Sequence, residues 1–259
     1  MAELDIPFDP ETGLRVSRTI IFGPTGSGKT VLAAALAKMY APRDPEMVYI
    51  LSPVPTLANL LPEYRWYKID PSDQQAVDGF FRHIKEKKCL VVIDEFDSYV
   101  GGSARSYGSK DMFAAIDYGR NFGCSLICCA HGTSDAPKNL IANSNLVLFF
   151  RTTEVGLLKY ADKYLTEVPN ASETLQSLGP HQALAYQPLA QDKFLGIIRY
   201  NQETDEIEVL PREAIWGNNE STSAPEPENP TTPDPSERSS TREEPPMPGG
   251  TAPPPVAEK

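Results

Sequence analysis

The chain has 259 residues, of which 40% are hydrophobic and 23% are charged, a composition that suits a soluble protein with a buried core. This length allows one ordinary α/β domain with an appendage and excludes two full-sized enzymatic domains. The formal net charge of −11 excludes a general electrostatic attraction to nucleic acid or anionic lipid, so any contact with DNA has to come from a local basic patch.

The sequence has the features of a cytoplasmic protein. No apolar stretch approaches the roughly 18–20 residues that span a bilayer, and the first ten residues are acidic and contain proline, unlike a signal peptide. We therefore expect no transmembrane segment. The four cysteines have apolar neighbours and lack paired CxxC spacing, which predicts buried reduced thiols rather than a metal site: Cys89, Cys124, Cys128 and Cys129.

The first part of the chain alternates between short apolar runs and helical patterns. The apolar runs predict buried strands at 19–22, 47–51, 89–93, 125–129 and 146–150. The helical patterns between them lie near 29–40, 72–87, 110–121 and 136–143. Such alternation predicts a three-layer α/β sandwich with a mainly parallel sheet.

After Arg151 the pattern changes. Two helices are expected, near 154–163 and 171–178, and three runs with strand character follow at 182–187, 194–200 and 206–210. We expect these runs to finish the same sheet in antiparallel fashion, so that residues 1–218 form one domain.

Residues 219–259 differ sharply from the rest in composition. They contain 11 of the 25 prolines, with three basic and eight acidic residues, and almost no large apolar side chains. A segment of this kind buries too little surface to offset its ordering entropy, which predicts a disordered acidic tail. Its role is left open between a solubilising extension and a docking tail for a partner.

Residues 23–30 match the phosphate-binding pattern GxxxxGK[ST] and lie directly between a predicted strand and a predicted helix. Glycines allow backbone N–H groups to turn toward the phosphates, and the N-terminus of the helix adds partial positive charge at the same place. Lys29 is expected to reach the β- and γ-phosphates, and the Thr30 hydroxyl to ligate Mg²⁺. The expected nucleotide-binding residues are Gly23, Pro24, Thr25, Gly26, Ser27, Gly28, Lys29 and Thr30.

Asp94 and Glu95 follow the third predicted strand and supply the second half of the expected site. Ligands bind outside the carboxyl ends of parallel strands, so Asp94 is positioned to hold the Mg²⁺ and Glu95 to activate a water as general base. Acids at a strand end also serve as simple turn formers, and it is the phosphate-binding loop that favours the catalytic interpretation. The adjacent acid Glu95 favours hydrolysis over transfer to a small acceptor, and no NKxD-like element is present to recognise guanine, so we expect hydrolysis of ATP.

Three segments carry a resemblance to a known family: 94–95, 118–131 with its Arg120-x-x-Gly123 block, and 139–151, which ends in LVLFFR. In this order they resemble the FtsK/HerA superfamily of DNA-pumping ATPases. In length the chain resembles most the genome-packaging ATPases of tailless double-stranded DNA viruses, many of which carry an internal membrane. The resemblance covers about residues 15–200 and implies the strand order 5-1-4-3-2 and a ring of subunits, expected to be a hexamer.

The chain departs from this family at His131. The family usually has Gln at the end of the fourth strand, where it senses the γ-phosphate or its water, whereas this chain has Ala-His-Gly-Thr. A neutral imidazole also donates a hydrogen bond, so we expect His131 to take this catalytic role. The alternative is a purely structural histidine at a strand end.

Two arginines match family-like positions for an arginine that completes the site of the neighbouring subunit. Arg120 leads into the fourth predicted strand, and Arg151 closes the fifth. Either would neutralise charge on the γ-phosphate during hydrolysis. Either would alternatively form an ion pair within its own subunit.

The segment 99–110 is rich in glycine and serine and is predicted to be an irregular loop. It carries Arg105, Tyr107 and Lys110 and no acid, so in a ring it is a candidate for contact with DNA phosphates and bases. A plain surface loop is the alternative.

We therefore predict an ATP- and Mg²⁺-dependent motor that moves double-stranded DNA, and the resemblance implies that it packages a viral genome into a preformed capsid. The resemblance implies the host cytoplasm as its location, and incorporation in the virion and contacts with a capsid vertex or inner-membrane proteins are left open. One alternative is a morphogenesis ATPase of the kind found in filamentous phages. Another is a nucleotide-dependent switch or adaptor that acts through the tail.

Overall fold

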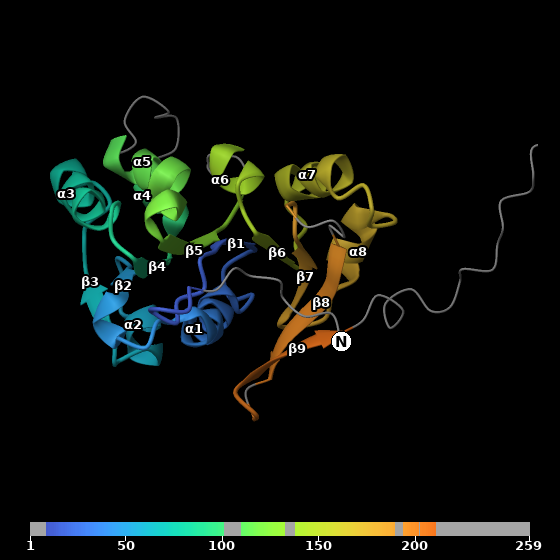
Figure 1. Cartoon of the computed structure of the whole chain (residues 1–259). Coiled ribbons are helices and arrows are strands. Elements are labelled where there is room, and N and C mark those ends of the chain that lie inside the picture. The colour runs from blue at the N-terminus through green and yellow to red at the C-terminus, as the bar shows by residue number, and fades with distance from the viewer. Residues whose placement is uncertain (1–8, 101–109, 133–137, 190–193, 202, 211–259) are drawn as a thin grey trace, which may run out of the picture. The chain divides into compact units, whose positions relative to one another are not determined.

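The computed structural model describes residues 9–100, 110–132, 138–189, 194–201 and 203–210. Within these residues one sheet of nine strands has the order β3-β2-β4-β5-β1-β6-β7-β8-β9 (Figure 1). Its strands are β1 Arg18–Phe22, β2 Val48–Leu51, β3 Arg65–Tyr67, β4 Cys89–Ile93, β5 Cys124–Ala130, β6 Leu146–Phe150, β7 Gln182–Tyr186, β8 Phe194–Asn201 and β9 Glu206–Leu210.

The sheet has a parallel part and an antiparallel part. The six strands β3, β2, β4, β5, β1 and β6, in their order across the sheet, all run parallel. Strands β7, β8 and β9 are each antiparallel to the strand before them. The five strands predicted first are neighbours in the order β6-β1-β5-β4-β2, which confirms the expected order 5-1-4-3-2. The predicted antiparallel finish is also confirmed.

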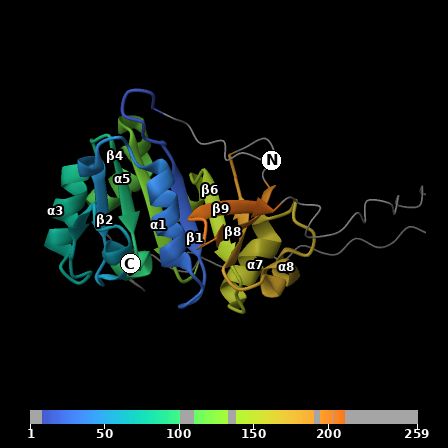
Figure 2. The same ribbon diagram turned by 90° about the horizontal axis from the view of Figure 1, so that it is seen from below.

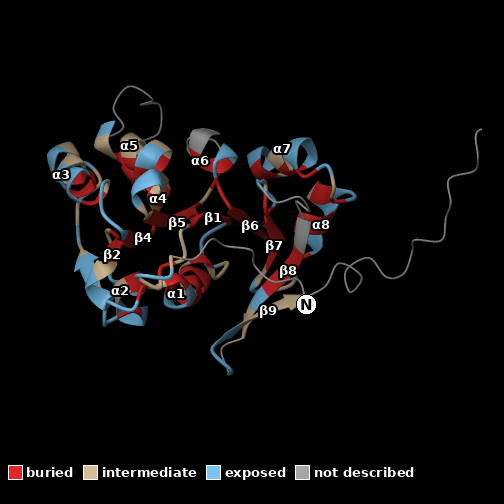
Figure 3. Cartoon of the chain, in the orientation of Figure 1, coloured by how far each residue is buried: buried red, intermediate tan, exposed pale blue. Residues whose placement is uncertain are grey.

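Helices cover both faces of this sheet, and the central strands between them are buried (Figures 1 and 3). One face carries α1 Lys29–Tyr40 and α2 Thr56–Leu60, and α1 lies across the central strands in the view from below (Figure 2). The opposite face carries α3 Gln74–Ile84, α4 Phe96–Val100, α5 Lys110–Tyr118, α6 Lys138–Ala142, α7 Val155–Tyr164 and α8 Ala171–Ser177. Two 3₁₀ turns, η1 Pro45–Met47 and η2 Gly119–Phe122, complete the described elements.

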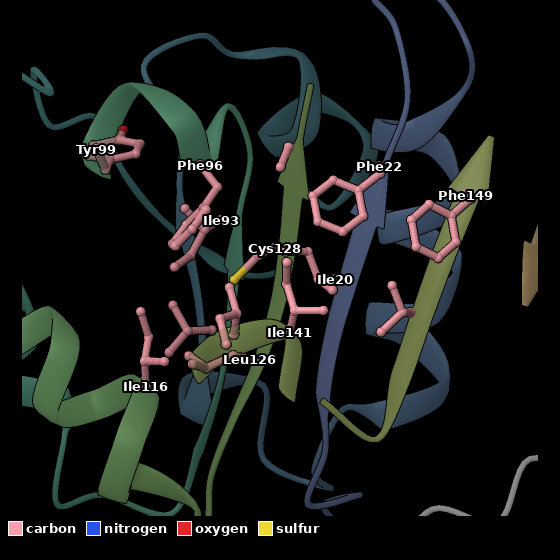
Figure 4. Close-up of a cluster of buried hydrophobic side chains, with 14 of the residues drawn as sticks. Ile20, Phe22, Ile93, Phe96, Tyr99, Ile116, Leu126, Cys128, Ile141 and Phe149 are labelled. Carbon is pink, nitrogen blue, oxygen red and sulfur yellow. The ribbon is translucent and has the colours of Figure 1, made fainter. Parts of the chain in front are cut away.

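Alternate residues of each central strand point into one of two hydrophobic cores, because successive side chains of a strand face opposite sides. On the face covered by helices α3 to α8, Phe22 of β1 stacks on its neighbour Phe149 of β6 with ring centroids 5.4 Å apart (Figure 4).

All four cysteines are free and buried, as predicted. Burial raises the pKa of the Cys128 and Cys129 thiols, which keeps them protonated. Among the described residues, no three His, Cys, Asp or Glu side chains form a group suited to a metal ion.

The prediction of an irregular loop over 99–110 was wrong at both ends. Tyr99 and Val100 belong to α4, where the buried ring of Tyr99 donates a hydrogen bond from its hydroxyl to the carbonyl of Ile69 at 3.1 Å. Lys110 is the first residue of α5. Short helices of five residues such as α4 lack the periodicity that identifies a helix in a sequence. The other two residues expected to contact DNA, Arg105 and Tyr107, lie outside the described residues.

Residues 211–259 lie outside the described residues, so the tail over 219–259 and its boundary stay predictions. In the described part of the chain, none of the helices combines the length and the apolar character needed to cross a bilayer.

Candidate nucleotide-binding site

The phosphate-binding loop connects the end of β1 to the start of α1. Its first residue, Gly23, donates its backbone N–H to the carbonyl of Ala130 at the end of the neighbouring strand β5, at 3.2 Å. A Cβ atom at Gly23 would lie 2.7 Å from Cβ of Phe150, so this position accepts only glycine. Gly28 has a φ of +104°, a left-handed conformation that residues with a side chain rarely adopt. The loop is therefore held in shape by the strands on both sides of β1.

Lys29, the first residue of α1, lies within this loop. Its side chain is buried, and its ammonium donates hydrogen bonds to the carbonyls of Gly23 at 2.8 Å and Pro24 at 3.0 Å. A third neighbour is Nδ1 of His131, 3.5 Å from Lys29 Nζ. The cation is thus presented at the concave side of the loop, where phosphates bind in proteins with this pattern.

Thr30 and Asp94 provide a pair of oxygen donors beside the loop. The Thr30 hydroxyl lies 3.3 and 3.4 Å from the two carboxylate oxygens of Asp94, which is 2% exposed. Burial and the charge of Glu95 raise the pKa of Asp94, and this effect is opposed by hydrogen bonds from Thr30 and from the Glu95 backbone and by the charge of Lys29. Hydroxyl and carboxylate oxygens are ligands that Mg²⁺ prefers, so this donor set fits the ion.

Glu95, His131 and Lys29 form a continuous polar network. The Nε2 atom of His131 lies 2.7 Å from a carboxylate oxygen of Glu95. Because a carboxylate only accepts, Nε2 carries the proton, and in a neutral ring Nδ1 accepts from the ammonium of Lys29. The backbone N–H of His131 also donates to the carboxylate of Asp97 in α4. His131 therefore lies between the phosphate-binding loop and the acidic pair at the end of β4.

Glu95 has a strained backbone, with a φ of +54° in the left-handed region. This turn directs the chain from β4 straight into α4, and it lets the Glu95 N–H donate to Asp94 Oδ1 at 3.2 Å. Strained non-glycine residues are concentrated at functional sites, where the surrounding structure maintains them.

The two candidate arginines lie at opposite ends of the parallel strands. Arg120 is in η2 before β5 begins, whereas His131 follows the end of β5. At about 3.3 Å per residue, the seven residues of β5 separate Arg120 from its own phosphate-binding loop by roughly 20 Å. Arg151 directly follows β6 at the same edge as that loop, and it lines a cavity together with loop residues.

Residues 179–181 also lie at this end of the strands, a position that nothing in the sequence beyond a Gly-Pro turn signal indicates. They precede β7, which is antiparallel to β6, with Phe150 opposite Ala183. The start of β7 therefore meets the end of β6, and His181 comes to lie against Gly28. Asp97 was missed for a different reason, because its contact with His131 depends on α4, which was not predicted.

Comparisons with known proteins agree with this fold. A family model described as "ATPase family associated with various cellular activities (AAA)" matches residues 19–152, whereas no curated protein matches the chain. The genome packaging NTPase B204 of Sulfolobus turreted icosahedral virus 2, in complex with sulfate, is 15% identical with a TM-score of 0.55, over 75% of this chain and 96% of that one. Its complex with AMPPCP is 16% identical with a TM-score of 0.53, over 76% and 97%. EssC (ATPases 2 and 3) of Geobacillus thermodenitrificans is 16% identical with a TM-score of 0.46, over 69% and 38%.

At these identities the two B204 structures, with TM-scores above 0.5, establish a common fold and no more. The family model, in contrast, spans more than half of the chain, from β1 with its phosphate-binding loop to the residue after Arg151. The chain is thus a P-loop ATPase, and it belongs to the AAA family, the ATPases associated with various cellular activities.

Proposed function

We propose that this ATPase is a motor of the FtsK/HerA type that moves double-stranded DNA, packaging a viral genome into a preformed capsid. The observation that carries the proposal is the network Lys29–His131–Glu95 beside the Thr30–Asp94 pair. It has the groups that ATP hydrolysis requires, in a fold similar to that of a viral genome packaging NTPase.

Each side chain of the network has a distinct task in the proposed hydrolysis. Lys29 and the backbone N–H groups of residues 23–28 bind the phosphates, and Thr30 and Asp94 would hold Mg²⁺, which neutralises phosphate charge. The Glu95 carboxylate takes a proton from the water that attacks the γ-phosphorus, as the bond from that phosphorus to the bridging oxygen breaks and ADP leaves. His131 Nε2–H fixes the orientation of Glu95, and its link to Lys29 connects the base to the phosphate clamp.

Arg120 is proposed to serve the site of the neighbouring subunit. It lies too far from its own phosphate-binding loop to reach it, and its surroundings suit a contact with a second copy. Tyr118 and Phe122 on either side of it are 62% and 48% exposed. The buried Arg18 lies close by, and among the described residues its Nε and Nη2 atoms have no hydrogen-bond partner. Burial and the charge of Arg120 lower the pKa of Arg18 although the charge of Asp117 opposes them, so an anionic partner would stabilise the two arginines at this corner.

The proposed partners are double-stranded DNA and further copies of this chain in a ring, with six subunits as in the family it resembles. Contacts with DNA are proposed for Arg105, Tyr107 and Lys110, and these residues would face the pore. Capsid-vertex or inner-membrane proteins are proposed docking partners in a host cytoplasm.

The test is the rate of ATP hydrolysis by the full chain with and without duplex DNA. We expect duplex DNA to stimulate turnover, Lys29→Ala to abolish it, and Lys159→Ala, at an exposed position of α7, to behave as wild type. Deletion of residues 219–259 should leave the stimulated rate intact.

ATP turnover that does not respond to DNA would refute the motor. If deletion of residues 219–259 also abolished the biological function of the protein while ATP hydrolysis persisted, a nucleotide-dependent switch that acts through the tail would be the better explanation.

A further inference from the structure

A cavity of about 320 Å³ lies beside the phosphate-binding loop, and the residues that line it outside this loop have so far been given no task within their own subunit. Three segments line it: residues 24–27 of the loop, Phe150 and Arg151 at the end of β6, and residues 179–181 before β7. Its volume is within the range of roughly 300–1,000 Å³ that is usual for small-molecule sites.

The turn that forms the far wall is well defined. Gly179 donates its N–H to the side-chain oxygen of Gln182 at 2.8 Å, and Gln182 donates its N–H back to the carbonyl of Gly179 at 3.3 Å. These bonds hold His181 with a φ of +59°, and a Cβ built on Gly28 would lie 3.0 Å from His181 Nδ1. The imidazole is therefore placed against the loop by a strained backbone, the kind of local strain that occurs at binding sites.

The position of the cavity relative to the catalytic network indicates which end of a bound nucleotide would lie there. Glu95 and His131 follow β4 and β5, on one side of β1, and in the proposed hydrolysis they face the γ-phosphate. The cavity lies on the other side of β1, at the ends of β6 and β7. A nucleotide whose γ-phosphate faces Glu95 has its opposite end, the base and ribose, on the β6–β7 side.

We propose that this cavity holds the base and ribose of ATP, with Arg151 and His181 as the side chains that contact them. The inference rests on the proposed ATP site at residues 23–30 and adds the part of the ligand that those residues do not bind. A planar guanidinium and an imidazole are suited to stack on a heterocyclic base, and both also donate hydrogen bonds to ribose oxygens. Arg151 then serves the nucleotide of its own subunit, and Arg120 is the arginine left for the neighbour.

The experiment separates nucleoside from phosphate binding by calorimetry on the full chain with Mg²⁺. The two ligands are the non-hydrolysable ATP analogue AMPPCP and inorganic tripolyphosphate, which has phosphates and no nucleoside. Arg151→Ala and His181→Ala are compared with wild type, and Arg43→Ala and His83→Ala, exposed residues away from the cavity, are the matched controls. Because Arg151 and His181 are exposed, both variants are expected to fold, which a thermal melt verifies.

We expect each cavity variant to bind AMPPCP roughly fivefold to twentyfold more weakly, the loss of one stacking contact, and to bind tripolyphosphate as wild type does. Unchanged affinity for AMPPCP in both variants would overturn the proposal. An equal loss for both ligands would also overturn it, because the residues would then act on phosphates. If wild type bound neither ligand, the proposed ATP site itself would be wrong.

Discussion

Replacing Asp94 by Asn is expected to stabilise the fold while it abolishes hydrolysis. The Asp94 carboxylate is 2% exposed and follows β4 immediately before the acidic side chain of Glu95. Burial and this like charge both disfavour its ionised form, as the raised pKa of Asp94 indicates. Asn has nearly the same shape and no charge, so it removes both penalties without leaving a cavity.

The magnitude follows from the contacts that would be lost and kept. The carboxylate accepts from the Thr30 hydroxyl only at 3.3 and 3.4 Å, which is long for a bond from a hydroxyl. The Glu95 N–H bond at 3.2 Å has an acceptor in Asn as well. We therefore expect a net gain of about 1 kcal/mol in the free energy of unfolding near neutral pH, which raises the Tm by roughly 2–4 °C in a domain of this size.

The gain should depend on pH in a defined direction. Because the pKa of Asp94 in the folded state is above its ordinary value of 3.8, the folded protein binds more protons than the unfolded one in the interval between these pKa values. Wild-type stability therefore falls as the pH rises through that interval. Asn does not titrate, so its advantage over wild type is full above the interval and disappears below 3.8.

Urea unfolding of both proteins at several pH values, in EDTA and without nucleotide, measures this difference. An Asn variant that is less stable than wild type by about 1 kcal/mol or more, with a difference independent of pH, would refute the reasoning. It would mean that the hydrogen bonds of Asp94 stabilise the fold by more than the free-energy cost of burying its charge.

Three further predictions concern the site and its neighbours. His131→Gln should retain ATPase activity, whereas His131→Ala should lose roughly a hundredfold in kcat because Glu95 loses its donor; a fully active Ala variant would make His131 structural. Arg120→Ala should be inactive alone and should poison wild-type subunits in mixed assemblies, and simple dilution of activity would contradict the contact between subunits. Gly23→Ala should lower the free energy of unfolding by about 1–3 kcal/mol, since its Cβ would meet Phe150 at 2.7 Å; an unchanged urea midpoint would disprove this clash.

The central strands were predictable because each is a continuous apolar run, the pattern typical of strands buried on both faces. The strand β3 was missed because its three residues are half-exposed or exposed and form no such run. Helices α2 and α4 have five residues each, too few to show a helical period. The errors therefore concern short elements, whether they lie at the border of the sheet like β3 or beside its central strands like α4.

The same distinction applies to the candidate site. Lys29, Asp94 and His131 could be placed together from the sequence because the parallel strands before them all end at one edge of the sheet. The approach of residues 179–181 could not, because it depends on the antiparallel direction of β7 and on a turn more than 150 positions away from Gly28 in the sequence. Pairings over such distances leave no local pattern.

The borders of the sheet constrain how copies of this chain can associate. At one border, β3 has only three residues, and its Arg65 is paired with Glu46 at 2.7 Å. At the other, Glu206 and Glu208 lie along β9, and Glu208 binds Arg199 and Asn201 of the strand beside it. Short length and charged side chains at a sheet border prevent a second chain from adding its own strand. Lateral growth into a fibre is thereby disfavoured at both described borders, so the proposed ring would have to use side-chain surfaces, such as the corner around Arg120, to join one copy to the next.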